Sequence, residues 1–166
     1  MRVLVTAASR HGSTAEIASD IANVLRKHGI ETDETTPAEV ESVSDFDGVV
    51  LGSAVYEGHW LEPAKALVTR CADQWEGSRV WLFSSGPIGS PPKPVDADAP
   101  KKVIEQVGPI EHRVFAGKLD RDELGLLERT MVRAVHAPEG DFRDWDEVED
   151  WATSIADTLL EGSVVN

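Results

Sequence analysis

The sequence is short of cysteine, of long apolar runs and of basic residues, and each shortage excludes a class of protein. Its one cysteine, Cys71, cannot form an intrachain disulfide, a cysteine zinc cluster or a Cys-x-x-Cys redox pair. Redox chemistry would therefore require a bound cofactor. Because Cys71 has the spacing of a helix core position, we expect a buried, inert thiol. The histidines lack ligand spacing, so we predict no metal site.

No segment approaches the roughly 18 apolar residues of a membrane span, and the apolar run Val3 to Ala8 is too short for a signal peptide. We therefore predict a cytoplasmic protein without an integral membrane segment. Sixteen lysines and arginines oppose 30 aspartates and glutamates, which gives a net charge of −14. Such a surface repels phosphate backbones and anionic lipids and favours solubility, so we predict no nucleic-acid partner.

Buried-type strand sequences alternate with helix-period segments along all 166 residues, which predicts one α/β domain over residues 1–166. Its parallel sheet would carry helices on both faces, in a doubly wound fold. The expected strands are residues 3–8, 30–35, 47–53, 80–85 and 112–117, and the polar second strand fits a sheet edge. The expected helices are residues 14–28, a helix entered near Pro63 that passes Trp75 and ends at Gly77, and a last helix capped by Asp144 and Glu147.

Two stretches do not fit into this arrangement of five strands and three helices. Residues 86–100 hold five prolines and resemble a rim or lid. Residues 120–142 contain apolar residues at helical spacing, which predicts an inserted helix over the fifth strand. We expect Trp75, Trp81, Trp145 and Trp151 to lie in the core.

Ligands of open parallel sheets bind at the carboxyl ends of the strands, so the loops there are the candidate site. The first loop contains Ser9, Arg10, His11, Gly12, Ser13 and Thr14. Its hydroxyls, backbone N–H groups and helix start suit a phosphate. A capping box between Ser13 and Glu16 is the alternative, because it would satisfy the helix end without a ligand. The fingerprints of nucleoside triphosphate and dinucleotide sites are absent.

The second loop, residues 52–60, has two glycines for backbone freedom and two aromatic residues. Tyr56 and Trp60 could cover a planar ring, although Trp60 could instead begin the core face of the next helix. The third loop, residues 85–89, could offer backbone amides and carbonyls to a ring edge, or could be a turn into the proline-rich rim. His59 could donate a proton, but a surface histidine is the commoner case, so we assign no catalytic residue.

The first loop resembles the flavodoxin phosphate loop, [ST]-x-T-G-x-T, with His11 in place of a threonine and Arg10 as an added cation that could contact phosphate. The resemblance covers nearly the whole chain. It implies a five-stranded sheet of order 2-1-3-4-5 and non-covalent FMN, with phosphate on the first loop. The flavin ring would then lie between Ala54, Val55, Tyr56, Glu57 and Gly58 of the second loop and Ser85, Gly86, Pro87, Ile88 and Gly89 of the third.

Within that superfamily the chain resembles the menaquinone-dependent protoporphyrinogen oxidase branch. Residues 52–60, GSAVYEGHW, resemble its G-[AS]-[SA]-[IV]-x-x-G-H-[YW] loop, and residues 115–119, FAGKL, contain its A-G-x-L. Residues 144–148, DWDEV, resemble its D-W-E-x-V. The extra segment of that branch is basic and aromatic, whereas residues 120–135 are acidic and contain no aromatic residue.

These patterns predict an FMN-dependent redox protein and favour an oxidoreductase. The loop motifs favour a porphyrinogen-like donor and a quinone acceptor, whereas the acidic surface favours an electron shuttle between redox partner proteins. A flavin-free interaction domain is a third possibility. Glu57 and Glu62 would lower the reduction potential if they lie near the ring. A phosphorylated receiver domain is excluded, because Ser9 and Ser53 occupy positions where it needs acids.

Overall fold

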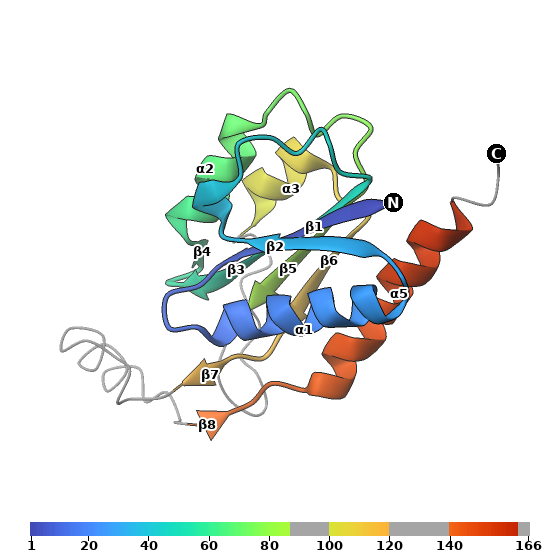
Figure 1. The fold of residues 1–166 in the computed structure, drawn as a ribbon. Helices are drawn as coiled ribbons and strands as arrows, with labels where there is room; N and C mark the ends of the chain where they lie inside the picture. Colours follow the sequence, from blue (N-terminus) through green and yellow to red (C-terminus); the bar gives the residue numbers. More distant parts are fainter. Residues whose placement is uncertain (87–99, 120–139, 163–166) are drawn as a thin grey trace.

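The computed structural model describes residues 1–86, 100–119 and 140–162 (Figure 1). Its sheet contains five parallel strands in the order β2-β1-β3-β5-β6, which confirms the predicted doubly wound fold and strand order. The strands are β1 (Arg2–Ala8), β2 (Glu31–Thr35), β3 (Gly48–Tyr56), β5 (Val80–Ser85) and β6 (Glu111–Phe115). As predicted, the polar second strand lies at an edge and the apolar first and third strands lie inside.

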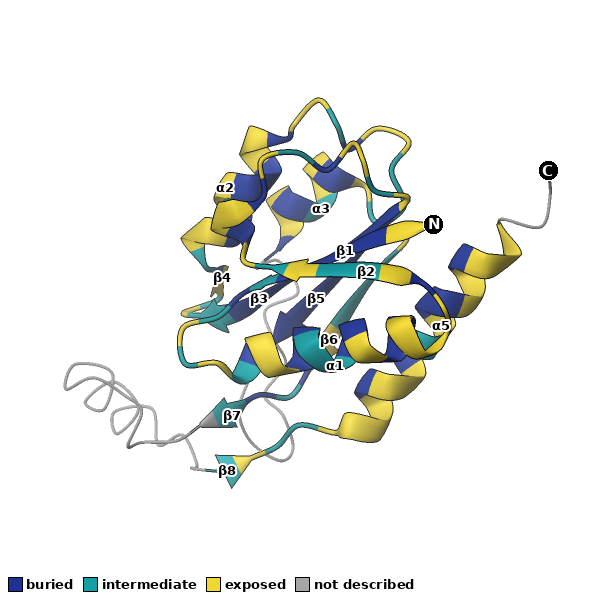
Figure 2. Cartoon of the chain, in the orientation of Figure 1, coloured by how far each residue is buried: buried dark blue, intermediate teal, exposed yellow. Residues whose placement is uncertain are grey.

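Helices cover both faces of the sheet, as Figure 1 shows. One face carries α1 (Ser13–Lys27) and α5 (Trp145–Glu161), and the other carries α2 (Glu62–Arg70), α3 (Lys101–Val107) and the 3-10 turn η1 (Pro37–Glu39). Each long helix turns its buried side to the sheet and its exposed side outward (Figure 2). This arrangement leaves the two ends of the sheet open for loops.

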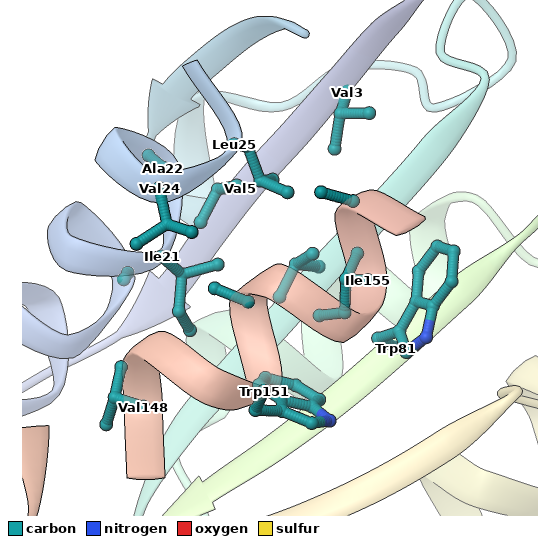
Figure 3. Packing of buried hydrophobic residues seen from close by; sticks show 14 of the residues in the cluster. Val3, Val5, Ile21, Ala22, Val24, Leu25, Trp81, Val148, Trp151 and Ile155 are labelled. Atoms are coloured by element: carbon teal, nitrogen blue, oxygen red, sulfur yellow. The ribbon is translucent and has the colours of Figure 1, made fainter. Parts of the chain in front are cut away.

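The core beneath α1 and α5 is aromatic at its centre. Trp151 packs edge-on against Phe115, with ring centroids 5.4 Å apart, and against Phe83 at 6.1 Å. Trp81, near the start of β5, lies beside Ile155 of α5, and both residues are buried (Figure 3). Edge-to-face packing of this kind adds to the burial energy and fixes the rings. Trp81 and Trp151 are therefore core residues, as predicted.

The core on the other face includes Trp75 and Cys71. Cys71 is fully buried, as predicted, and burial raises the pKa of its thiol, which disfavours the reactive thiolate. Helix α2, however, ends at Arg70, so the predicted continuation past Trp75 to Gly77 is wrong. Trp75 reaches the core from a turn and donates its indole N–H to the carbonyl of Val68 at 3.0 Å. Core spacing alone did not distinguish this turn from a helix.

Trp145 is 36% exposed, so its predicted core position is wrong. It is the first residue of α5, and the buried stripe of that helix begins one turn later, at Val148. Its ring lies under the guanidinium of Arg143, 4.6 Å from ring centroid to guanidinium carbon. The predicted cap is present: Asp144 accepts a hydrogen bond from the N–H of Glu147 at 3.1 Å.

Three features were not predicted: helix α3, the strand β4 (His59–Trp60) antiparallel to the end of β3, and a ribbon of β7 (Lys118–Leu119) with β8 (Gly140–Asp141). The ribbon pairs the two residues before position 120 with the two residues after position 139. The expected inserted helix falls on those residues and the expected rim on 87–99, so both lie outside the described residues. No helix in the described part of the chain is long and apolar enough to cross a membrane.

Candidate functional site

The strand register brings the carboxyl ends of four strands to one edge of the sheet. Ala8 pairs with Ser53, Ser53 with Ser84, and Ser85 with Phe115. The loops after β1, β3 and β5 therefore begin side by side, as the topology predicted. The candidate site is the set of groups that these loops present at this edge.

The first loop leaves the head of α1 open. Gly12 has φ +86°, a conformation that suits glycine, and donates its N–H to the Ser9 hydroxyl at 3.1 Å. The first helical hydrogen bond runs from the Glu16 N–H to the Gly12 carbonyl at 2.9 Å. The three N–H groups before that of Glu16, on Ser13, Thr14 and Ala15, have no acceptor among the described residues. They are free to bind an anion.

Ser13 decides between the two interpretations of this loop. Gly12, not Ser13, is the N-cap residue of α1, and no side chain caps the helix, so the alternative of a capping box with Glu16 is wrong. The Ser13 hydroxyl oxygen is buried and has no hydrogen-bond partner among the described residues. A buried hydroxyl without a partner costs about 1–3 kcal/mol. A phosphate oxygen would satisfy it, so the loop fits the phosphate of a nucleotide cofactor.

The second loop is a tight hairpin turn between β3 and β4. Its two central residues, Glu57 and Gly58, have φ of +50° and +77°, the signs that a two-residue type I′ turn requires. Half-buried Tyr56 lies at the end of β3, and the Arg10 guanidinium stacks over its ring at 4.7 Å. This contact joins the first and second loops. Contact between Arg10 and phosphate, and between Tyr56 and a flavin ring, remain predictions.

Trp60 anchors this hairpin in the core. It is 2% exposed and donates its indole N–H to the Ser84 hydroxyl at 2.8 Å, while the Leu61 N–H donates to the Ser53 hydroxyl at 2.9 Å. Of the two alternatives for Trp60, the core position is therefore correct. Tyr56, by contrast, is only half-buried. His59, at the start of β4, is exposed, as expected for a surface histidine.

Ser84 continues into a second hydrogen bond, to Nε2 of His112 at 2.9 Å. Burial lowers the pKa of His112, because the protonated, positively charged ring would be poorly solvated at this position. The Ser84 hydroxyl therefore joins two neighbours: its oxygen accepts from the indole of Trp60, and it is hydrogen-bonded to the ring of His112. The sequence did not predict this chain, because its members come from β4, β5 and β6.

The third loop is described only at its start. Ser85 is buried, and Gly86, with φ +115°, donates its N–H to the carbonyl of Phe115 at 2.9 Å. Pro87, Ile88 and Gly89 lie outside the described residues. The role of this loop at a ring edge remains a prediction.

The two acids expected near the ring differ in their surroundings. Glu62 has an 80% exposed side chain and pairs with Lys65 at 2.9 Å, which offsets its charge. Glu57 is exposed at the tip of the hairpin turn, next to Tyr56. Glu57 is therefore the better candidate to influence a ring bound beside Tyr56.

Arg143 is the residue that sequence reasoning missed. It lies two residues after β8, yet its guanidinium reaches the first turn of α1, where it donates to the Glu16 carboxylate and to the Ser13 carbonyl at 3.3 Å. Its side chain is 4% exposed. No local pattern signals such a contact, because its partners are 127 and 130 residues away.

The strand order, the open head of α1 and the aromatic hairpin beside it define a flavodoxin-like protein. The chain belongs to the flavodoxin family, because the family model described as "Flavodoxin domain" matches its residues 4–146. The chain is 24% identical to protoporphyrinogen IX dehydrogenase [quinone] of Escherichia coli K12, over 94% of this chain and 95% of that protein.

Two solved structures share the fold at low identity. An archaeal flavodoxin is 16% identical, with a TM-score of 0.62, over 96% of this chain and 99% of that one. The rubredoxin oxygen:oxidoreductase of Desulfovibrio gigas is 13% identical, with a TM-score of 0.64, over 99% of this chain. The match covers only 37% of that larger protein. The chain is thus a flavodoxin-family protein that is similar in sequence to a protoporphyrinogen IX dehydrogenase, and its likeness to the two solved structures shows the shared fold.

Proposed function

We propose that this protein binds FMN non-covalently and acts as an FMN-dependent oxidoreductase. The observation that carries the proposal is the buried Ser13 hydroxyl beside the three unbonded N–H groups at the head of α1. A phosphate at this position would satisfy all four groups and would lie at the positive end of the helix dipole. Bound FMN would supply the electron-transfer chemistry, and the chain would supply its position and electrostatic surroundings.

The residues of the other two loops would hold the ring. Tyr56 offers a half-buried aromatic face at the end of β3, supported from one side by Arg10. Ser85 and Gly86 lie at the neighbouring strand end, since Ala54 pairs with Ser85. A ring between these loops would be within reach of the phosphate loop, because all three begin at one edge.

For the electron partners, we propose a porphyrinogen-like donor and a quinone acceptor. In each turnover two electrons and two protons would leave the donor and reduce the quinone to a quinol. Support comes from the curated relative, whose match spans nearly the full length of both chains. The competing proposal, a shuttle between redox proteins, rests on the net charge of −14, which favours docking on a basic partner.

Binding is tested by titrating the cofactor-free protein with FMN and, separately, with riboflavin, followed by flavin fluorescence. We expect saturable quenching with FMN and at least tenfold weaker binding of riboflavin, which lacks the phosphate. Equal binding of both flavins would contradict the phosphate site. Absence of binding by either would leave the flavin-free interaction domain as the function.

The acceptor is tested with the FMN-loaded protein under anaerobic conditions. Protoporphyrinogen IX and a soluble naphthoquinone should give porphyrin fluorescence and quinol in step, whereas a shuttle should reduce a basic redox protein such as cytochrome c and leave the quinone untouched.

In either case, Glu57→Gln should raise the midpoint potential, because it removes a negative charge beside the ring. Glu62→Gln is the matched control, since Lys65 already offsets that charge. Equal potentials in wild type and Glu57→Gln would refute the role of Glu57.

A further inference from the structure

The buried guanidinium of Arg143 makes contacts along its edges and on one of its faces. Its Nε and Nη2 donate to the two carboxylate oxygens of Asp141 at 2.9 and 2.7 Å. Its Nη1 donates to the Glu16 carboxylate and to the Ser13 carbonyl, and its flat face covers the ring of Trp145. A planar fork with five donors is the only side chain that fits all of these partners at once.

The contact with Ser13 has a directional consequence for the next residue. A trans peptide is planar, so the Ser13 carbonyl and the Thr14 N–H point in opposite directions within one rigid unit. Holding that carbonyl therefore fixes the direction of the Thr14 N–H. This N–H is one of the three unbonded groups at the head of α1.

The charges around Arg143 argue for orientation rather than attraction. One guanidinium and the two carboxylates of Asp141 and Glu16 sum to +1 − 2 = −1, so the cluster does not itself draw an anion to the loop. Glu16 also lies in the first turn of α1, so Arg143 holds that turn by both a side chain and a carbonyl.

We propose that Arg143 is a positioning residue for the phosphate loop: it ties the end of the β7–β8 ribbon to the Ser13 carbonyl and thereby aims the N–H groups that receive the phosphate. The inference rests on the proposed function, because it assigns to Arg143 the selectivity of that site for a phosphorylated flavin. It also makes the ribbon part of the phosphate site, although none of its residues lies in the first loop.

The test compares Arg143→Gln with Arg26→Gln, which removes an arginine from the far end of α1 where it pairs with Glu34 at 3.5 Å. Arg143→Gln should weaken FMN binding at least tenfold and riboflavin binding by less than twofold. In the cofactor-free protein, amide hydrogen exchange at Glu16, whose N–H makes the first hydrogen bond of α1 to the Gly12 carbonyl, should become faster, while exchange at Ile21 stays unchanged. Arg26→Gln should match wild type in all of these measurements.

Two further variants separate geometry from charge and protect the test against misfolding. Arg143→Lys keeps the charge without the fork, so it should recover less than half of the lost binding free energy. Glu16→Gln removes a negative charge but keeps an acceptor oxygen for Arg143, so it should weaken FMN binding less than Arg143→Gln does. If Arg143→Gln fails to fold, Asp141→Asn loosens the same fork and should show the same loss of FMN selectivity in milder form.

The possible results are distinguishable. Equal losses for FMN and riboflavin, or full recovery by Arg143→Lys, would overturn the positioning role. Failure of wild type to bind either flavin would instead overturn the proposed function. In that case, unchanged hydrogen exchange at Glu16 in Arg143→Gln would also overturn the ordering of the first turn of α1 by Arg143.

Discussion

The first loop and the β3–β4 hairpin lie at the same edge of the sheet but are stabilised in different ways. The hairpin is anchored from below by Trp60 and Ser53, whose polar groups are paired within the fold. The first loop leaves the Ser13 hydroxyl and three N–H groups without partners among the described residues. The difference shows which loop is shaped by packing and which is complete only with a ligand. It predicts that hairpin substitutions cost stability and that first-loop substitutions cost binding.

The largest effect is expected at Gly52, where β3 passes beneath the hairpin. A Cβ at this position would fall inside the ring of Phe83, which is fully buried and cannot move aside because Phe115 and Trp151 pack against it. Gly52→Ala should lower the free energy of unfolding by about 3 kcal/mol, measured by urea denaturation. Gly48→Ala is the control: its Cβ meets the end of the Leu159 side chain at 3.1 Å, and the loss should be at most half as large. Equal losses would contradict the steric account.

Trp60→Phe should cost about 2 kcal/mol of stability, because it removes the indole hydrogen bond to Ser84 and leaves a gap in the core. Trp145→Phe changes an exposed ring and should cost less than about 0.5 kcal/mol. The midpoints of thermal unfolding of Trp60→Phe and Trp145→Phe, each compared with that of wild type, measure the two losses. A smaller loss at Trp60 than at Trp145 would mean that the hairpin is not anchored through the core.

Ser13→Ala should do the reverse. It removes a buried hydroxyl that has no protein partner among the described residues, so stability should stay constant or rise slightly. FMN affinity should fall about tenfold, or roughly 1.4 kcal/mol, with riboflavin affinity unchanged. Fluorescence titration measures both. Unchanged FMN affinity would remove Ser13 from the phosphate site.

The smallest effect concerns His112 and the pH dependence of stability. Burial lowers the pKa of His112 in the folded chain, whereas the unfolded chain takes up a proton near the ordinary value of 6.5. The contribution of neutral His112 is therefore present above about pH 6.5 and is lost as the pH falls toward the lower pKa of the folded chain. The midpoint of thermal unfolding of His112→Gln should decline less steeply than that of wild type between pH 7 and 5. Parallel profiles would contradict a half-buried His112 that is neutral in the folded chain.

The sequence predicted what depends on local pattern. Apolar runs located β1, β3 and β5, and the stripe from Val148 to Leu159 located α5, because burial on one or both faces of an element leaves a periodic signal. Helix ends were harder to predict. Trp75 has the spacing of a helical core residue but enters the core from a turn after α2. Trp145 is a large aromatic residue, a type common in cores, but it lies before the buried stripe of α5 begins.

The missed parts of the site depend on contacts distant in sequence. The β3–β4 hairpin had a local signal, Glu57-Gly58 between strand-forming residues, that could have predicted it. Arg143 had none, because its partners at Ser13 and Glu16 become neighbours only after the sheet has formed. The Ser84 and His112 pair also depends on the alignment of β5 and β6.

The β7–β8 ribbon has a consequence for how such a chain can change over evolution. Lys118 pairs with Asp141 and Leu119 with Gly140, so the residues that flank 120–139 lie opposite each other as at the base of an ordinary hairpin. Two strand ends at that spacing can be joined by two residues or by many without moving the sheet. The ribbon is thus a ready insertion point, where nature or an engineer could exchange one segment for another while the fold beneath is preserved.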